Sequence, residues 1–325
     1  MSAEAPPDTP TVGGASDSPA EATATRGAAA APLPGAALLV TRGLRVDVAG
    51  TPAIDGLTLA TTGDHVLVLG AARALFEAAA GLRAVARGEV RVAGVGPREA
   101  MRAAAACAPL DPRMPPAWTL AEYATWSARL AGHPRATARA MAREALGRMQ
   151  LAGVAKTKVA DAAPATRRGT VVAAALATGA RVLLVDDPVS GLPDEAARTL
   201  GRVLVRALAD RRSVVFAARA PLESPLALGA DEAVVVDGSA VSAQGAPAEI
   251  AARAETFAVR VGGDVGAFAA GVEAAGGRAL VTAGAPPPVH VRVDLGPLAT
   301  RDLFRIAAER GAVVVELRPL AGVFA

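Results

Sequence analysis

The sequence has little of several residue types whose abundance would define a function class. It contains one cysteine, Cys107, which excludes an intramolecular disulfide framework and a cysteine-rich zinc site. No uncharged apolar run reaches the roughly 18 residues that a spanning helix needs, and the longest candidate, residues 169–185, is interrupted by Arg181. The N-terminus lacks the basic and apolar segments of a secretory signal. We therefore expect a cytoplasmic chain whose membrane association is at most peripheral.

Lysines and aromatic residues are also scarce. Lys156 and Lys158 are the only lysines, and aromatic residues make up 3% of the chain. The hydrophobic fraction of 52% and the charged fraction of 20% are ordinary for a soluble globular protein. The pI of 9.7 accompanies a net charge of only +3, and no cluster of basic residues stands out along the sequence. We therefore expect no nucleic-acid partner.

Composition divides the chain into three parts. Residues 1–36 are rich in Ala, Pro, Thr, Ser and Gly and have almost no large apolar side chains, which predicts disorder. Residues 37–250 show alternating strand and helix patterns, interrupted by a helical region at about residues 112–165. Residues 251–325 show the order β-α-β-β-α-β, which is typical of a small ferredoxin-like α+β domain.

Hydrophobic periodicity places the elements within these parts. Apolar runs and alternation predict strands at residues 38–48, 54–59, 65–69, 89–92, 182–185, 213–217, 232–237, 257–261, 279–281, 289–295 and 313–317. Helical spacing predicts helices at residues 71–81, 120–130, 136–151, 171–177, from Asp194 onward, and at residues 265–275 and 298–310. Thr119 followed three residues later by Glu122 is a capping box that should start the second of these helices.

Two adjacent carboxylates, Asp186 and Asp187, follow the apolar run Val182–Val185. Such a run indicates a strand that is buried on both faces, as in a parallel sheet. Ligand sites in open α/β sheets lie at the carboxyl ends of the strands, so the pair fits a metal-phosphate site. Because Asp-Pro is common turn chemistry, the pair also fits a strand-terminating turn.

The order of these landmarks resembles the ATP-binding subunits of ABC transporters over about residues 37–325. Among them it is most similar to exporter-type subunits that carry a C-terminal extension and work with a separate permease. The resemblance rests on Leu183-Leu184-Val185-Asp186-Asp187-Pro188, at the Walker B strand, followed by Ser190-Gly191-Leu192 at the D-loop. The other matching segments are residues 88–92, 119–123, 243–250, 300–303 and 316–319.

The resemblance implies a fold, cofactors and partners. It implies a P-loop NTPase-like α/β domain of the ABC type, with a RecA-like core and an inserted helical subdomain, plus the small C-terminal ferredoxin-like domain. It also implies ATP with Mg²⁺ as cofactors and a membrane permease subunit as partner. The chain would form a homodimer, or a heterodimer with another ABC ATPase, at the inner face of the cell membrane.

The phosphate-binding motif of this family is largely missing. A P-loop needs glycines that let backbone N–H groups surround the phosphates, followed by Gly-Lys-Ser/Thr. Counted from Gly70, the Gly-Lys-Ser/Thr positions hold Leu75, Phe76 and Glu77. Alignment on Ala80-Gly81-Leu82 instead puts Ala72 at the lysine position and makes the loop several residues short, so neither register offers a lysine. Arg73 is the nearest cation. Since a charge-assisted hydrogen bond is worth about 1.5–3 kcal/mol, the loss should weaken nucleotide binding by roughly two to four decades.

The family's other motifs are degenerate as well. The adenine-stacking aromatic falls near Val48 and the loop glutamine at about Leu110. The signature motif becomes residues 162–166, which include Pro164 and no glycine, and the switch histidine falls at about Arg219. Pro193 takes the position of the family's D-loop aspartate.

The family's motif residues are retained in part at the Walker B strand. Asp186 is the residue that could hold Mg²⁺, and Asp187 stands at the catalytic glutamate with a side chain one methylene shorter. Ser190 begins the D-loop. The candidate nucleotide site is therefore Gly70, Ala72, Arg73, Asp186 and Ser190, with Asp187 as the candidate catalytic group.

Three functions are open from the sequence. The leading one is a catalytically degenerate subunit that docks on a permease through its helical subdomain. A slow but genuine ATPase that uses Arg73 and Asp187 to energise export is the second, and a soluble regulatory module no longer coupled to transport is the third. Tyr123 and Trp126 are expected on one helix of the subdomain, in core packing or facing the permease.

Overall fold

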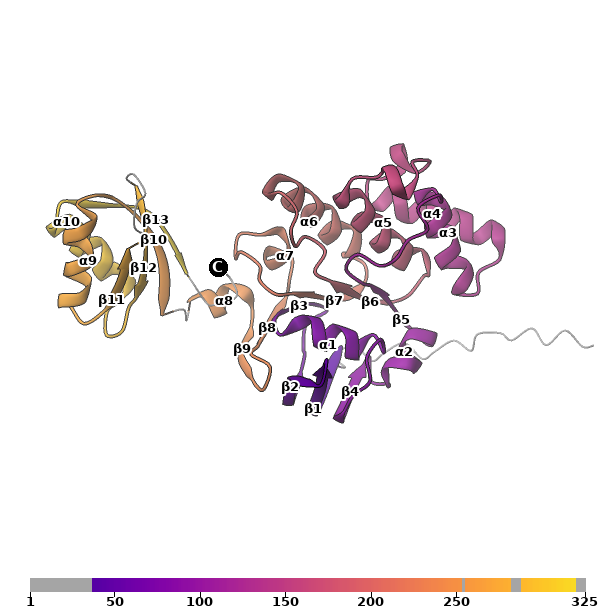
Figure 1. Ribbon diagram of the computed structural model, residues 1–325, viewed down its shortest axis with the longest axis horizontal. Coiled ribbons are helices and arrows are strands. Elements are labelled where there is room, and N and C mark those ends of the chain that lie inside the picture. Colours follow the sequence, from indigo (N-terminus) through magenta and orange to yellow (C-terminus); the bar gives the residue numbers. More distant parts are fainter. Residues whose placement is uncertain (1–36, 253–254, 282–287, 320–325) are drawn as a thin grey trace, which may run out of the picture. The chain divides into compact units, whose positions relative to one another are not determined.

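The computed structural model describes residues 37–252, 255–281 and 288–319, so the disorder expected for residues 1–36 lies outside the described part. Strands and helices alternate in residues 37–252 (Figure 1). The strands here are Leu39–Val48 (β1), Thr51–Ala60 (β2), His65–Gly70 (β3), Arg87–Val92 (β4), Ala105–Ala108 (β5), Val182–Asp186 (β6), Arg212–Ala217 (β7), Glu232–Val236 (β8) and Val241–Gly245 (β9).

The helices of the same segment follow most strands. They are Ala72–Ala79 (α1), Pro97–Ala103 (α2), Leu120–Leu130 (α3), Arg135–Arg148 (α4), Pro164–Ala177 (α5), Asp194–Leu208 (α6), Pro225–Leu228 (α7) and Pro247–Ala252 (α8), with short 3₁₀ turns at Ala152–Val154 (η1) and Val159–Asp161 (η2). The capping box expected at Thr119 is confirmed, because Glu122 N–H donates to Thr119 Oγ1 and Thr119 N–H donates to Glu122 Oε2.

Two sheets organise this segment. A six-stranded sheet has the order β5-β6-β7-β3-β8-β9, in which β9 is antiparallel and the other strands run parallel. A three-stranded antiparallel sheet has the order β2-β1-β4. Helix α1 contacts strands of both sheets, so it links the two layers. The carboxyl ends of β3, β6 and β7 lie side by side and form the edge at which the predicted site residues meet.

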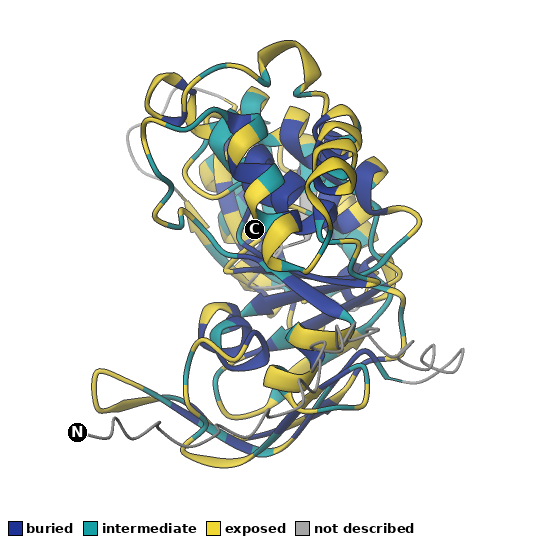
Figure 2. Ribbon diagram, turned by 90° about the vertical axis from the view of Figure 1, so that its right-hand side faces the viewer, coloured by how far each residue is buried: buried dark blue, intermediate teal, exposed yellow. Residues whose placement is uncertain are grey.

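Burial on both faces is confirmed for β3 and β6. Residues Val182–Asp186 are all buried, and alternate residues join different hydrophobic clusters. Leu183 and Val185 pack with α3–α6, whereas Val182 and Leu184 pack with α1 and the antiparallel sheet. This follows from the two-residue period of a strand. Figure 2 shows the result as buried residues along the strands and on the inner sides of the helices.

Helix α5 corrects one prediction. The sequence predicted a helix from Val171, but α5 begins at Pro164. Proline is favoured at the first helical position because its fixed φ suits the helix and its missing N–H would have no partner there. Helix α2 and strand β5 were not predicted at all, since their short, Ala-rich segments show no clear periodicity.

Residues 255–319 form the expected β-α-β-β-α-β order within their described part. The elements are Thr256–Gly263 (β10), Val265–Ala274 (α9), Arg278–Val281 (β11), Val289–Asp294 (β12), Thr300–Glu309 (α10) and Ala312–Pro319 (β13). The antiparallel sheet has the order β11-β12-β10-β13, and its hydrophobic cluster includes Val259, Phe268, Val291 and Leu303.

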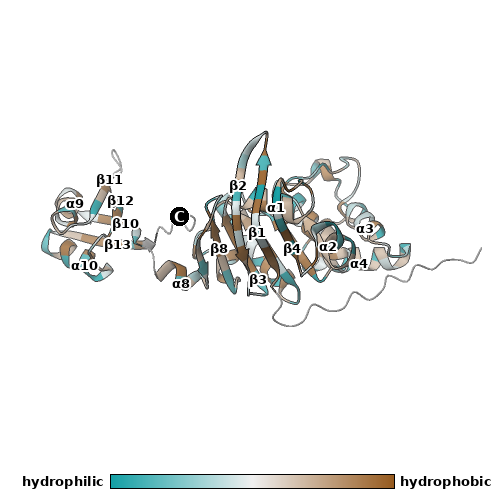
Figure 3. Cartoon of the chain, turned by 90° about the horizontal axis from the view of Figure 1, so that it is seen from below, coloured by the Kyte–Doolittle hydropathy of each residue, from teal (hydrophilic) through white to brown (hydrophobic). Residues whose placement is uncertain are grey.

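Hydropathy follows the strands in Figure 3, where brown residues concentrate along the sheets. None of the helices in the described ranges is both long enough and apolar enough to cross a bilayer.

Candidate functional site

The connection between β3 and α1 is a single residue, Ala71. Gly70 ends β3 with φ +91°, and a Cβ there would lie 2.1 Å from the carbonyl oxygen of Val236. Gly70 N–H donates to Ala218 O at 3.2 Å, and Ala71 N–H donates to Val236 O at 2.9 Å. A P-loop is expected after this strand, but here both N–H groups are bound to carbonyls at the ends of neighbouring strands. Ala72, at the lysine position, is buried and offers no polar group.

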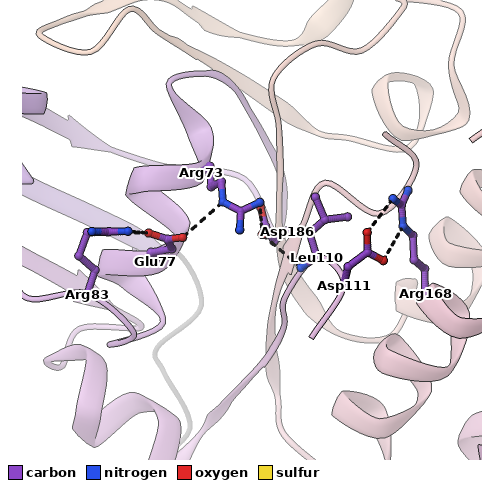
Figure 4. A network of polar contacts seen from close by, with 7 residues as sticks. All are labelled: Arg73, Glu77, Arg83, Leu110, Asp111, Arg168 and Asp186. Carbon is purple, nitrogen blue, oxygen red and sulfur yellow. Dashed lines mark hydrogen bonds and ion pairs between the residues drawn. The ribbon is translucent and has the colours of Figure 1, made fainter. Parts of the chain in front are cut away.

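Arg73 reaches from the first turn of α1 toward the end of β6 (Figure 4). Its Nη1 lies 4.0 Å from Asp186 Oδ2, and its Nε donates to Glu77 Oε1 at 3.3 Å. Glu77 also pairs with Arg83, at 2.6 Å between Arg83 Nε and Glu77 Oε2. The guanidinium of Arg73 therefore lies between two carboxylates of its own chain.

Asp186 ends β6 with its side chain 3% exposed. Its Oδ2 accepts a hydrogen bond from Leu110 N–H at 3.2 Å, so the loop position expected for glutamine contributes a backbone donor. Burial raises the pKa of Asp186, and the Leu110 N–H and Arg73 oppose that rise. Asp186 Oδ2 thus has contacts from two other segments of the chain.

Asp187 has left-handed backbone geometry, with φ +38°. Its N–H donates to Phe216 O at 2.7 Å, and its carboxylate accepts from the Ala218 backbone and from Ser190. Burial raises the pKa of Asp187, and these hydrogen bonds together with Arg168 lower it in part. The carboxylate is held against the ends of β7 and the following loop.

A second ion pair connects the loop after β5 to helix α5. Arg168 pairs with both carboxylate oxygens of Asp111, Nε to Oδ1 at 3.3 Å and Nη2 to Oδ2 at 3.2 Å (Figure 4). The same guanidinium donates through Nη1 to the carbonyl of Ser190. Ser190 is therefore tied to Asp187 and Arg168, while Arg73 is paired with Asp186.

The structure brings together part of the predicted site. Arg73 approaches Asp186, and Asp187 contacts Ser190, whereas Gly70 and Ala72 contribute only backbone at the tight β3–α1 connection. The sequence analysis missed Glu77 and Arg168 as members of these networks. The four-residue spacing of Arg73 and Glu77 could have revealed the first. Nothing in the sequence could have revealed Arg168, because 57 residues separate it from Asp111.

Several polar groups of the candidate site have partners within the chain. The backbone N–H groups at the β3–α1 connection are used within the chain, and Pro164, which has no N–H, occupies the first position of α5. Within residues 37–252, 255–281 and 288–319, no three His, Cys, Asp or Glu side chains gather as metal ligands.

Comparison with known proteins identifies the fold. No protein-family model matches the sequence. Over 90 residues the chain is 32% identical to the lipoprotein-releasing system ATP-binding protein LolD of Nitratidesulfovibrio vulgaris; the match covers 28% of this chain and 39% of LolD. The aligned segment thus spans well under half of that relative.

Solved ATP-binding cassettes share the architecture over nearly their whole length. CbiO1 of Clostridium perfringens, part of the ABC transporter complex CbiONQ, superposes with TM-score 0.58 and 18% identity, covering 67% of this chain and 92% of CbiO1. A nucleotide-free ATP-binding cassette from an ABC transporter gives 0.56 and 15%, covering 65% and 91%. The ADP conformation of the cassette MJ1267 gives 0.56 and 14%, covering 67% and 95%. The fold expected from the resemblance to ABC-transporter ATP-binding subunits is confirmed: this chain has the fold of an ABC ATP-binding cassette.

Proposed function

We propose that this protein is an ABC-type ATP-binding subunit that no longer hydrolyses ATP and acts as a structural or regulatory half of a transporter. It docks on a membrane permease at the inner face of the membrane. It pairs there with a second copy or with a competent ABC ATPase. The partner part of the proposal rests on similarity, since LolD is named for a lipoprotein-releasing system and CbiO1 for a transporter complex.

The main support for lost hydrolysis is the closed β3–α1 connection. Hydrolysis of a phosphoanhydride depends on positioning and on cations and donors around the transferred group. At this connection the N–H groups of Gly70 and Ala71 are bound to Ala218 O and Val236 O, and the backbone of Gly70 packs so closely that a Cβ there would lie 2.1 Å from Val236 O. Opening a phosphate-binding loop here would break two hydrogen bonds and rebuild the backbone.

The ion pair of Arg73 and Asp186 supports the same conclusion. Asp186 is the one carboxylate that could retain Mg²⁺, and the Arg73 guanidinium lies 4.0 Å from it. A bound divalent cation beside that guanidinium would meet like-charge repulsion in a partly desolvated site. We propose that Arg73 acts as the resident cation of Asp186.

Nucleotide binding to the full chain tests the proposal. Titration calorimetry with ATP and Mg²⁺ should give a Kd above about 1 mM, because two to four decades of affinity are lost with the lysine and the cradle. Asp186→Ala should change this result no more than Asp161→Ala, a control on the exposed turn η2. Submillimolar affinity that Asp186→Ala abolishes would refute the proposal.

Turnover separates the degenerate subunit from the slow ATPase. The purified chain should release no phosphate from ATP above background, with or without Asp187→Asn. Turnover that is lost in Asp187→Asn and in Arg73→Ala would favour the slow ATPase. The soluble regulatory module would gain support if the chain, expressed with its natural partners, stays out of the membrane fraction.

A further inference from the structure

A small pocket lies at the amino ends of β3 and β7, at the edge of the six-stranded sheet opposite the candidate nucleotide site. Its volume is about 200 Å³. The two strands pair in parallel, with His65 level with Ser213. Two residues further along, Leu67 is level with Val215. These side chains share one face of the sheet because side chains alternate along a strand, and about 7 Å separates the two pairs. The pocket therefore has a polar end at the sheet edge and an apolar part further in.

Helices α6 and α7 cover this face of the sheet and form the opposite wall of the pocket (Figure 1). Leu204 and Leu208 lie one turn apart on α6, and Leu226 comes from α7. All three side chains are buried, as are Leu67 and Val215 beneath them. The five residues belong to the same hydrophobic cluster. Away from its polar end, the pocket is thus lined by large apolar side chains.

Two glycines fix the wall that α6 and α7 form. A Cβ at Gly201 of α6 would lie 3.4 Å from Pro225 Cβ, and a Cβ at Gly229, which ends α7, would lie 2.5 Å from Val205 Cγ1. The two helices therefore meet closely at both ends of α7. Because these contacts involve backbone, the pocket is formed before any ligand enters it. A preformed site binds with a smaller ordering cost than one that must assemble around its ligand.

The volume of the pocket sets the size of a ligand. Protein interiors contain few voids larger than a water molecule, because unfilled space leaves the surrounding atoms without contacts. An apolar cavity of about 150 Å³ stays dry and binds benzene. A pocket of about 200 Å³ holds a molecule somewhat larger than benzene. Ala209, at the end of α6, lines the pocket and is exposed, so the pocket is accessible from solvent.

The polar end of the pocket matches a hydroxyl group. Ser213 is 2% exposed, and its Oγ lies 3.2 Å from His65 Nδ1. In the part of the chain that the structure describes, neither side chain has another hydrogen bond. With a neutral imidazole, the serine hydroxyl either donates to Nδ1 or accepts from it, and in both cases the pair retains one donor and one acceptor. An alcohol or a phenol donates and accepts, whereas a carboxylate only accepts.

The charges next to this polar end also disfavour an anionic ligand. Asp64 precedes His65 and pairs with Arg212, with 2.6 Å between Asp64 Oδ1 and Arg212 Nε. Asp231 Oδ2 accepts a hydrogen bond from His65 N–H at 3.0 Å. Two carboxylates therefore adjoin the polar end beside that one arginine. A carboxylate ligand would meet like-charge repulsion here, and a neutral ligand would not.

We infer that this pocket binds a small neutral molecule that has an apolar body and one hydroxyl group, of the size of a simple phenol. The apolar body contacts Leu67, Leu204 and Leu226, and the hydroxyl group forms hydrogen bonds with Ser213 and His65. The site is separate from the proposed function. It lies at the amino ends of the strands, whereas Asp186 and the other candidate nucleotide residues lie at the carboxyl ends, where ligands of open α/β sheets usually bind.

Three ligands of similar size test the inference on the full-length protein. They are 4-ethylphenol, ethylbenzene, which lacks the hydroxyl group, and 4-ethylbenzoate, which is charged. Titrations followed by saturation-transfer NMR give the Kd of each. We expect 4-ethylphenol to bind saturably at one site. Ethylbenzene should bind about fivefold more weakly, since it cannot form the hydrogen bonds. The benzoate should bind at least tenfold more weakly than the phenol.

Two variants place the ligand in this pocket. Ser213→Ala should weaken 4-ethylphenol binding about fivefold and change ethylbenzene binding less than twofold. Ser127→Ala, which removes a half-buried hydroxyl on α3, is its control and should change neither. Ala230→Leu adds a larger side chain to the pocket wall and should weaken binding of both ligands at least tenfold. Ala258→Leu, at a half-buried alanine on β10, is the matched control and should leave both Kd values unchanged. Circular dichroism of each variant checks that it is folded.

Three results would overturn the inference. The first is the absence of saturable 4-ethylphenol binding. The second is equal affinity for 4-ethylphenol and ethylbenzene, which would show that the polar end recognises nothing. The third is unchanged binding to folded Ala230→Leu, which would place the ligand elsewhere. If Ala230→Leu does not fold, the comparison of Ser213→Ala with Ser127→Ala decides. No nucleotide is present in these titrations, so their failure leaves the ATP-binding test of the proposed function unaffected.

Discussion

Asp187 places a carboxylate in a partly buried position and in a left-handed backbone conformation. It is partly buried, and burial raises the pKa of its carboxyl above that of the unfolded chain. A carboxyl whose folded pKa is raised binds protons more tightly when folded, so ionisation at neutral pH reduces the free energy of unfolding. The left-handed backbone at φ +38° suits Asp or Asn better than other residues with a Cβ.

We predict that Asp187→Asn raises the Tm at pH 7. Asn keeps the shape and the acceptor oxygen toward Ala218 N–H, and it removes the cost of a buried charge. This increase in Tm should shrink as the pH falls through the raised pKa of Asp187 in the folded chain. It should vanish below about pH 3.9, where the carboxyl is protonated in both states. Thermal unfolding followed by circular dichroism between pH 3.5 and 7 measures this.

The exposed residue Asp161 supplies the control for that experiment. Asp161→Asn should leave the Tm unchanged across the same pH range. A lower Tm for Asp187→Asn at pH 7 would show that the ionised carboxylate is needed by its hydrogen-bond donors, and the argument from burial would be wrong.

At the scale of secondary-structure elements, the turn between β3 and α1 requires the glycine at position 70. Gly70→Ala would place a Cβ 2.1 Å from Val236 O, in a left-handed conformation, at a point where β3 pairs with β8. We predict a loss of about 2–4 kcal/mol in the free energy of unfolding, since both the clash and the strain must be relieved by moving backbone. Urea unfolding gives the value.

The Gly94→Ala variant separates the effect of the steric clash from the effect of the backbone strain. Gly94 has a similar φ of +87°, but nothing lies within 4 Å of a Cβ built there. Its alanine variant should lose only about 1 kcal/mol, which is the conformational cost alone. Equal losses for the two variants would contradict the close approach to Val236.

The elements also show which features the sequence could predict. Strands β3 and β6 were predicted because a strand buried on both faces has an unbroken apolar run. The start of α3 was predicted because a capping box is local. The Asp111–Arg168 ion pair was not, because it joins residues that only the tertiary fold brings together.

The sequence predicted which residues form the candidate site, but not which groups those residues contact. Asp186 and Asp187 were located from the end of an apolar strand. Leu110 and Ala218 supply backbone donors to these two carboxylates. These contacts depend on how two loops pack, and the sequence has no periodic pattern that predicts loop packing. The missing lysine was evident at once. The hydrogen bonds that close the β3–α1 connection without it join residues that are far apart in the sequence.

At the scale of the whole molecule, the hydrophobic clusters divide along the chain. Among the described residues, the cluster around Phe268 draws on positions 257 and later, whereas the clusters around Phe216 and Leu204 draw on positions up to 250. We expect the boundary near residue 251 that the sequence indicated to separate two units that unfold independently.

Phe268→Ala tests this expectation. The side chain is fully buried in α9, so its removal should cost about 3–5 kcal/mol. In calorimetry of the full chain, one transition should move to lower temperature and another should stay in place. Phe304→Ala, half exposed on α10, should move neither by much. A single transition that shifts as a whole would show that the two parts unfold together.

The scarcity of lysine has a practical consequence once the positions are known. Lys156 and Lys158 are both exposed and lie in the connector between η1 and η2. Every other basic side chain except the three histidines is an arginine, which does not react with amine-directed reagents. An amine-specific cross-linker can therefore attach to side chains of this chain only at positions 156 and 158, so a partner recovered with it must lie near this connector. Endoproteinase Lys-C cleaves the chain only in the same short connector.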